Sequence, residues 1–208
     1  MSKSNNREPR KNNQSIVEEK LKTLNLGLPE SIKGANPEMK MPPSWIRVRG
    51  NRAFISGHGP QNPDGSIAGP FGKVGNDADV TLEQAYQAAR LATLSILGTL
   101  KRELGDLDRV TAWLMVSGFV NVAAGFTKTT AVINGCSELI LELYGPEVGQ
   151  HARTAMGVAT TPFGIPVIIA AEVEIDITAQ IPIDAFRSSN EDLENIGGII
   201  RKKGTIGE

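Results

Sequence analysis

An arginine at the start of a strongly apolar segment is the residue of this chain best suited to bind a ligand. It lies in His151-Ala-Arg-Thr-Ala-Met-Gly-Val158, and Pro162 and the apolar run from Val167 to Ile175 follow. A guanidinium in apolar surroundings needs an anionic partner, because an unpaired buried charge is costly. Where no carboxylate of the chain serves, a ligand carboxylate can pair with Arg153. We expect His151 to be structural.

A second candidate site follows a predicted strand that ends in Ser56-Gly57-His58-Gly59-Pro60. Residues 57–75 contain six glycines and three prolines, which predicts a long loop on a rigid scaffold. The segment lacks both the P-loop pattern and the third glycine of a dinucleotide fingerprint. His58 is the only side chain of this region that titrates near neutral pH, so it is either an exposed loop residue or a group that lines a cleft.

The composition argues against several classes of protein. Twenty-two basic and 23 acidic residues give a net charge of −1, which offers no electrostatic footprint for nucleic acid. One cysteine and two histidines allow no internal disulfide and predict neither a metal site nor a cofactor. Cys136 is expected to be a buried helix residue. We find no secretory leader pattern and no apolar run of roughly 18 residues, so we expect a cytoplasmic protein without a membrane span.

Hydrophobic periodicity and turn residues predict seven main elements and a short first helix. The 208 residues suffice for one domain with tails. Ser15 and Glu18 form a capping box at the start of the first helix, and Gly50-Asn51 marks a hairpin turn. The predicted elements are a helix over 15–26, a hairpin over 45–56, helices over 81–104 and 123–144, and strands over 109–117, 152–159 and 166–178.

This order, β-β-α-β-α-β-β, predicts an α+β domain of two layers, in which two helices pack on one mixed sheet. The other face of the sheet must also be covered, and a small domain often covers such a face by oligomerising. We expect residues 1–14 to be a disordered polar tail, residues 15–180 to form one domain, and residues 181–208 to be a polar extension. A basic nucleic-acid arm is the alternative for residues 1–14.

Eight short motifs follow one another along the predicted domain. They are Gly50-Asn51, Phe54-Ile-Ser-Gly57, Gly72-Lys-Val-Gly75, Ala88-Ala-Arg-Leu91, Leu107-Asp-Arg-Val110, Gly118-Phe-Val-Asn121, Val132-Ile-Asn-Gly135 and His151-Ala-Arg-Thr-Ala155. Together they resemble the Rid/YjgF family of reactive intermediate deaminases, members of which are also described as endoribonuclease L-PSP or translation initiation inhibitors. The resemblance covers residues 16 to 178 and looks closest to a longer, uncharacterised branch.

The resemblance implies a homotrimer of the chorismate-mutase-like fold with three clefts between subunits. It also implies that these clefts bind small carboxylates and hydrolyse enamines or imines to 2-keto acids. The matching motifs imply that Arg153 holds the substrate carboxylate, that Gly57 donates its backbone N–H nearby, and that Asn134 lines the cleft.

The sequence departs from the family pattern at the acidic positions of the last strand. The positions where the family carries its catalytic Glu and a second acidic residue fall on Ala170 and Ile168. The tyrosine that closes the family's site aligns near Pro43, and Trp45 is the candidate to replace it. Glu172 shares a strand face with Ala170, because side chains alternate with a period of two, and it is a candidate substitute together with His58.

Three functions therefore stay open at the level of sequence. The first is an imine or enamine deaminase, which the retained Arg153 and Gly57 favour. The second is a binding protein for small carboxylates that has lost the reaction, which Ala170 and Ile168 favour. The third is RNA cleavage or inhibition of translation, whose only support is the basic N-terminal tail.

Overall fold

The chain enters its sheet through the predicted hairpin and leaves it through the last apolar strand. In a computed structural model, residues 15–33 and 44–178 are described. The tail expected over 1–14, the extension over 181–208 and Pro43 lie outside these ranges. The elements are α1 (Ile16–Thr23), β1 (Ile46–Arg49), β2 (Arg52–His58), α2 (Leu82–Leu104), η1 (Leu107–Arg109), β3 (Val110–Asn121), α3 (Thr129–Gly149), β4 (Ala152–Val158), η2 (Pro162–Gly164) and β5 (Val167–Ile175).

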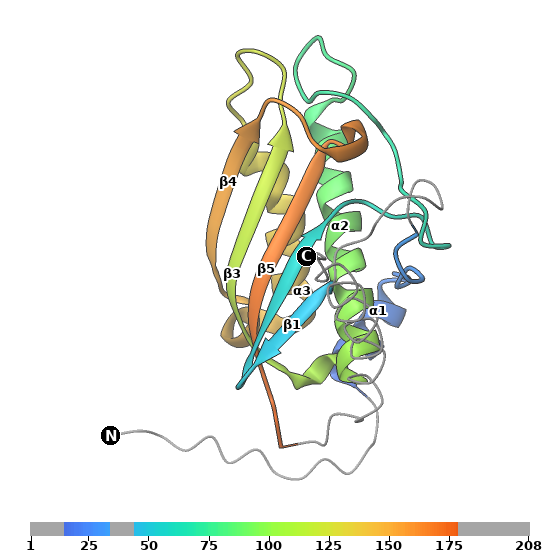
Figure 1. Ribbon diagram of the computed structural model, residues 1–208, viewed down its shortest axis with the longest axis vertical. Coiled ribbons are helices and arrows are strands. Elements are labelled where there is room, and N and C mark those ends of the chain that lie inside the picture. Colours follow the sequence, from blue (N-terminus) through green and yellow to red (C-terminus); the bar gives the residue numbers. More distant parts are fainter. Residues whose placement is uncertain (1–14, 34–43, 179–208) are drawn as a thin grey trace, which may run out of the picture.

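The strands form one mixed five-stranded sheet in the order β1-β2-β5-β3-β4. Only β3 and β4 pair in parallel; the other neighbouring strands are antiparallel. Parallel neighbours need a crossover, and α3 supplies it between these two strands. Strand β4 is the last in this order and is therefore an edge strand. Figure 1 shows α2 and α3 together behind the sheet. The predicted α+β architecture is confirmed, with α1 as a third, short helix.

Helix α2 begins and ends as the sequence predicts. Thr81 Oγ1 accepts a hydrogen bond from the Gln84 backbone N–H, and Gln84 Oε1 accepts one from that of Thr81. Gly105 ends the helix in the left-handed conformation at φ 78°. Helix α3 instead starts at Thr129, six residues later than predicted, because β3 continues to Asn121 to pair with Val158 of β4. Gly145 interrupts α3 with φ 74° and ψ 173°, where Gly145-Pro146 predicts its end.

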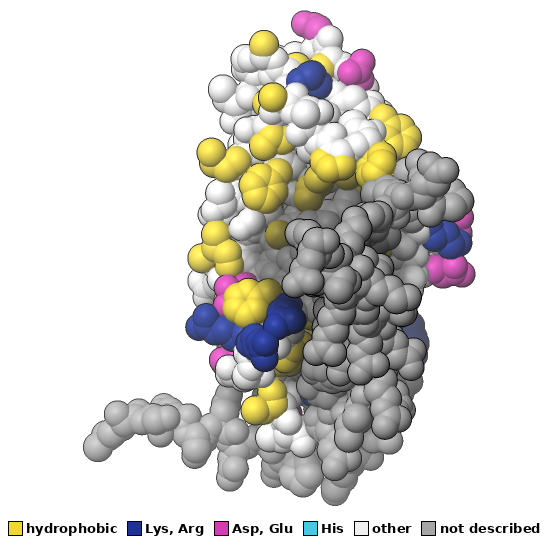
Figure 2. Space-filling view, viewed as in Figure 1, with side chains coloured by type: hydrophobic (Ala, Val, Ile, Leu, Met, Phe, Trp, Pro, Cys, Tyr) yellow, Lys and Arg dark blue, Asp and Glu magenta, His cyan; other side chains and the backbone are white. Residues whose placement is uncertain are grey.

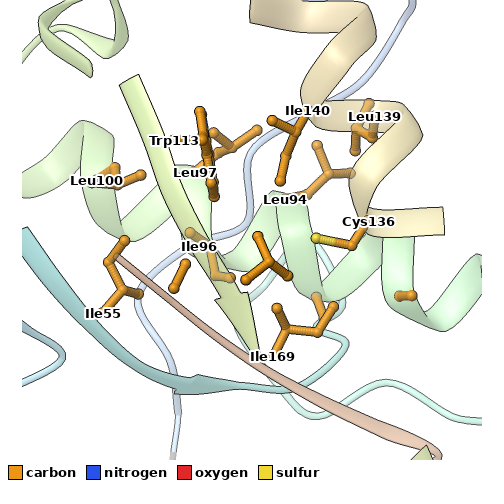
Figure 3. Packing of buried hydrophobic residues seen from close by; sticks show 14 of the residues in the cluster. Ile55, Leu94, Ile96, Leu97, Leu100, Trp113, Cys136, Leu139, Ile140 and Ile169 are labelled. Atoms are coloured by element: carbon orange, nitrogen blue, oxygen red, sulfur yellow. The ribbon is translucent and has the colours of Figure 1, made fainter. Parts of the chain in front are cut away.

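The hydrophobic core lies between the sheet and helices α2 and α3. Along β5 the odd-numbered residues from Val167 to Ile175 are buried and face the helices, while the even-numbered residues are half-buried. Figure 3 shows Trp113 and Ile169 of the sheet packed against residues such as Leu97 and Ile140 of the helices. Cys136 is fully buried among them, and burial raises the pKa of its thiol to about 12. The thiol is therefore protonated and inert at neutral pH.

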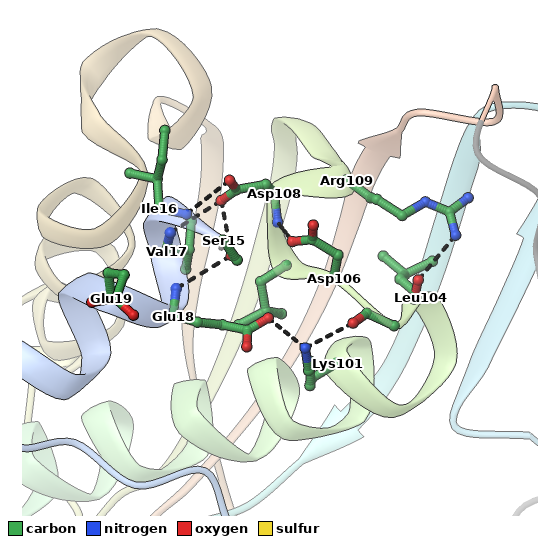
Figure 4. Close-up of polar contacts among 12 residues, drawn as sticks. Ser15, Ile16, Val17, Glu18, Glu19, Lys101, Leu104, Asp106, Asp108 and Arg109 are labelled. Atoms are coloured by element: carbon green, nitrogen blue, oxygen red, sulfur yellow. Dashed lines mark hydrogen bonds and ion pairs between the residues drawn. The ribbon is translucent and has the colours of Figure 1, made fainter. Parts of the chain in front are cut away.

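Helix α1 is attached to this core by polar contacts at its first turn (Figure 4). Ser15 accepts a hydrogen bond from the Glu18 N–H, as expected of an N-cap. The Glu18 carboxylate does not complete the capping box; it pairs with Lys101 of α2 at 2.6 Å. Asp108 satisfies backbone donors of the first turn instead. Its carboxylate accepts hydrogen bonds from the backbone N–H groups of Ile16 and Val17 at 2.8 and 3.0 Å.

No helix among the described residues covers the second face of the sheet. Phe54, Phe119 and Met156 are 43%, 36% and 54% exposed. All three belong to the alternate set of strand residues that points away from α2 and α3. Figure 2 shows hydrophobic side chains gathered on this face above a group of Lys and Arg. Within residues 15–33 and 44–178, no helix is long and apolar enough to cross a membrane.

Candidate functional site

The sheet register directs Arg153 toward helix α3. Arg153 pairs laterally with Val116, Val116 with Ala171, and Ala171 with Ile55. The last three are buried against the helices, and lateral neighbours in a sheet share a face. The side chain of Arg153 therefore lies on the helix side of the edge strand, where it is half-buried.

Two side chains of α3 fix the guanidinium of Arg153. Its Nη1 donates to Asn134 Oδ1 at 2.8 Å and to Ser137 Oγ at 3.1 Å. Asn134 and Ser137 are three residues apart and so lie on one helix face. These bonds use both hydrogens of Nη1 and leave Nε and Nη2, which have no partner among the described residues. This remaining edge has the side-on geometry that binds a carboxylate through two parallel hydrogen bonds.

No described Asp or Glu forms an ion pair with Arg153. The carboxylate that an arginine in this setting requires is thus not supplied by the described part of the chain. Asn134 and Ser137 are neutral partners, so they orient the guanidinium without neutralising its charge. The arrangement is suited to an anionic ligand.

His151 belongs to the same cluster, although we expected only a structural role for it. Its Nε2 lies 2.9 Å from Ser137 Oγ, and its Nδ1 lies 2.6 Å from the Gly149 carbonyl oxygen. Burial is the main cause that lowers the pKa of the imidazole, and the nearby charge of Arg153 adds to it. Sequence reasoning missed Ser137. Its spacing of three residues from Asn134 was the available signal.

Gly57 lies in a β-bulge beside an apolar cavity. Between paired positions Ile55–Ala171 and His58–Ile169, β2 advances three residues while β5 advances two, so one residue of β2 is extra. A Cβ at Gly57 would lie 2.7 Å from Cγ2 of Ile168. The adjoining cavity of about 180 Å³ is lined by twelve residues, including Trp45, Gly57 and Ile168. Gly57 and Trp45 therefore share one site.

His58 is not an exposed loop residue; it is fully buried at the end of β2. Its Nδ1 lies 2.6 Å from the Ser56 carbonyl oxygen and its Nε2 lies 2.9 Å from Thr99 Oγ1 on α2. Its ring centroid is 5.1 Å from that of Trp45. Burial lowers the pKa of His58 to about 4. The strand continues two residues into the predicted loop, which turns this side chain into the core.

Glu172 lies on the opposite face of the sheet from Arg153. It belongs to the half-buried, even-numbered set of β5, together with Ala170 and Ile168, and pairs with Arg52 at 3.0 Å. The expectation that Glu172 and Ala170 share a face is confirmed. Within one chain, however, Glu172 and the guanidinium of Arg153 are separated by the sheet itself.

The two sets of predicted binding residues lie at different edges of the sheet. Arg153 and Asn134 are at β4, whereas Gly57 and Trp45 are at β2 or next to it, and β5 and β3 lie between these strands. Three strand spacings correspond to about 14 Å. A single chain therefore does not bring the two sets together.

A larger hollow, of about 340 Å³, lies between the loops Gly75–Ala78 and Ala123–Lys128. None of the predicted site residues lines it. Its charged side chains are Asp77 and Lys128, which carry opposite charges and form no ion pair with each other.

Comparisons with known proteins identify the family of the chain. The model of the family “YjgF/chorismate mutase-like, putative endoribonuclease” matches residues 47–171. Protein TCP17 of Trypanosoma cruzi is 40% identical over 128 residues, which are 61% of this chain and 77% of that protein. The chain belongs to the Rid/YjgF family, which confirms the resemblance seen in its motifs.

Two solved structures show the same fold over most of the chain. Atu1372 of Agrobacterium tumefaciens, a protein of unknown function, is 36% identical with a TM-score of 0.66. The matched region covers 78% of this chain and 93% of the Atu1372 chain. A protein of Shewanella oneidensis, described as a putative endoribonuclease, is 26% identical with a TM-score of 0.68. The matched region covers 77% of this chain and 100% of the Shewanella chain. Both similarities extend beyond the span of the family model.

The buried imidazole of His58 predicts a pH-dependent stability. The unfolded chain binds a proton near the ordinary pKa of 6.5, while the folded chain binds it only near 4. Stability is therefore lost as the pH falls from about 6.5 to about 4, by roughly 3 kcal/mol in all, and levels off below. Urea unfolding of wild type and His58→Gln at pH 7 and pH 4 measures this loss. Equal losses in the two proteins would contradict the assignment.

The contact between Gly57 and Ile168 predicts a coupled pair of substitutions. Gly57→Ala places a Cβ against a β-branched side chain and should lower the free energy of unfolding by about 1–3 kcal/mol. Ile168→Ala in the same protein should remove the clash, so the double variant should be more stable than the sum of the two single effects implies. Denaturant unfolding of the four proteins checks this, and strict additivity would refute the steric constraint.

Proposed function

We propose that this protein is a Rid-type deaminase that hydrolyses reactive imino acids to 2-keto acids and ammonia. The observation that carries the proposal is the guanidinium of Arg153, which α3 holds through Nη1 while its Nε and Nη2 edge has no partner among the described residues. A substrate carboxylate on this edge is presented in a fixed orientation. Such positioning accounts for a large share of the rate enhancement of many enzymes.

The complete site is a cleft between copies of the chain in a homotrimer. Two observations support this assembly. Arg153 and Gly57 lie toward different edges of the sheet. The face that no described helix covers exposes Phe54, Phe119 and Met156. A ligand whose carboxylate is bound by Arg153 of one copy can then place its side chain in the cavity beside Gly57 of the next copy. An apolar cavity of about 150 Å³ accepts a molecule of the size of benzene, so the cavity of 180 Å³ favours aliphatic or aromatic side chains.

A binding protein for 2-keto acids or related carboxylates is the second candidate. The specific observation in its favour is that Ala170 and Ile168 occupy the positions at which the family carries acidic residues, and that neither can move a proton. The anion-binding half of the site would then remain without the reaction. The two candidates share Arg153 and differ only in turnover.

Imino-acid turnover tests the proposed reaction. An amino-acid oxidase generates the imino acid from leucine or phenylalanine, and semicarbazide competes with the protein for it. We expect wild type to accelerate hydrolysis over buffer, and Arg153→Ala to lose this acceleration by roughly 10- to 100-fold, because a charge-assisted pair contributes about 1.5–3 kcal/mol. Lys22→Ala, which removes an exposed cation on α1, is the matched control and should retain the wild-type rate.

Inactive wild type that still binds 4-methyl-2-oxopentanoate or phenylpyruvate in calorimetry would favour the binding protein, provided that Arg153→Ala abolishes the binding. Absence of both turnover and binding would refute the carboxylate site altogether.

Sedimentation equilibrium tests the assembly. Wild type should have the mass of three chains, and Phe119→Asp should dissociate it, because burying a charge on the apolar face of the sheet is costly. Ile16→Asp is the matched control, since Ile16 is also an exposed hydrophobic residue, 57% exposed, but lies on α1. A monomeric wild type, or a trimer indifferent to Phe119→Asp, would contradict the proposed interface.

A further inference from the structure

The hydroxyl of Ser137 lies between the anion-binding arginine and a histidine. Its Oγ is 3.1 Å from Arg153 Nη1 and 2.9 Å from His151 Nε2. Asn134 also holds the guanidinium, so orienting Arg153 does not by itself require Ser137. All four side chains are only partly buried and lie at the edge of the sheet, where a ligand can reach them.

The hydrogen bonds define which atoms carry protons. The Gly149 carbonyl can only accept, so Nδ1 of His151 must carry a hydrogen, and in the neutral ring Nε2 has a free lone pair. Arg153 can only donate, so Ser137 Oγ accepts from Nη1 and directs its own hydrogen to His151 Nε2. This is a hydroxyl paired with an oriented base, which is the arrangement that activates oxygen nucleophiles in enzymes.

We propose that Ser137 and His151 form the proton relay of this site and supply the acid–base function that Ala170 and Ile168 lack. This inference rests on the proposed deaminase reaction. Ser137 contacts the hydrolytic water, and His151 stores the proton behind it. The relay lies beside Arg153 on the helix side of the sheet, whereas the family's acidic positions lie on the other side.

The steps balance with water as the only co-reactant. A water molecule attacks the imine carbon of the iminium form of the substrate and forms the C–O bond of a carbinolamine. It gives its proton to Ser137 Oγ while Ser137 gives its own to His151 Nε2. The imidazolium then returns this proton through Ser137 to the amino group. As the C–N bond breaks, its electron pair leaves with ammonia, and the hydroxyl proton passes through Ser137 to His151 Nε2. The imidazolium then protonates the released ammonia. The products are the 2-keto acid and ammonium.

The surroundings of His151 favour the neutral ring that such a base requires. Burial and the Arg153 guanidinium lower its pKa below the usual 6.5, against the opposing effect of the hydrogen bond that Nδ1 donates to the Gly149 carbonyl. On α3, the thiol of Cys136 is protonated, and the carboxylate of Glu138 accepts a hydrogen bond from Tyr86 of α2. At pH 7 the imidazole is therefore neutral and able to accept a proton.

His151→Gln separates proton transfer from positioning. The amide oxygen of Gln can accept the hydrogen bond of Ser137, but it cannot take up a proton. The relay predicts that His151→Gln and Ser137→Ala each lower kcat for imino-acid hydrolysis by at least roughly 100-fold, while the Kd of His151→Gln for phenylpyruvate changes less than threefold. Ser137→Thr, which keeps the hydroxyl, should restore most of the rate.

The pH profile gives the readout that a structural role would not move. In wild type kcat/KM should fall as the pH drops through the lowered pKa of His151, below 6.5, and this limb should be absent in His151→Gln. Active wild type with an unchanged rate and profile in His151→Gln would overturn the relay and leave the deaminase standing. Wild type without turnover on any imino acid would overturn both. Circular dichroism confirms that each variant is folded before its rate is compared.

Discussion

The close approach of α3 to its neighbours is the constraint on which the site depends. A Cβ at Gly135 would lie 2.2 Å from the Tyr86 carbonyl oxygen of α2, and a Cβ at Gly118 would lie 2.5 Å from Ile133. Glycine at 135 therefore allows the backbones of α2 and α3 to approach closely, and glycine at 118 leaves room for the Ile133 side chain of α3. The contacts fix both the height and the rotation of α3 over β3 and β4. Asn134 and Ser137, on either side of Gly135, are thereby aimed at Arg153.

The parallel pairing of β3 with β4 places this cluster at the rim of the molecule. Because α3 forms the crossover, its middle and the strand after it are neighbours, so His151 and Arg153 meet side chains that precede them by 14 to 19 residues. A central strand would have buried the guanidinium completely, at a high desolvation penalty. The edge position keeps Arg153 half-buried. Its guanidinium is thus partly desolvated, which strengthens an ion pair, and it remains accessible from the rim.

Strand alternation separates Arg153 from the positions at which the family resemblance implies acidic residues. Ile168, Ala170 and Glu172 point away from the helices, and Arg153 points toward them. Ile168 instead packs against the bulge at Gly57 and closes one wall of the apolar cavity. A carboxylate at this position would have to be desolvated beside apolar side chains. Ile168 makes this wall of the cavity hydrophobic, which supports the proposal of ligands with apolar side chains.

The sequence by itself determined the local structure and the family. Capping at Thr81, the stop at Gly105 and the strand β5 each depend on neighbours a few residues away, and each was predicted correctly. Tertiary structure decided where the side chains point. The burial of His58, the replacement of the Glu18 cap by Asp108, and the meeting of Ser137 with His151 and Arg153 depend on register and helix rotation. Contacts between distant segments set these quantities, and local periodicity carries no information about them.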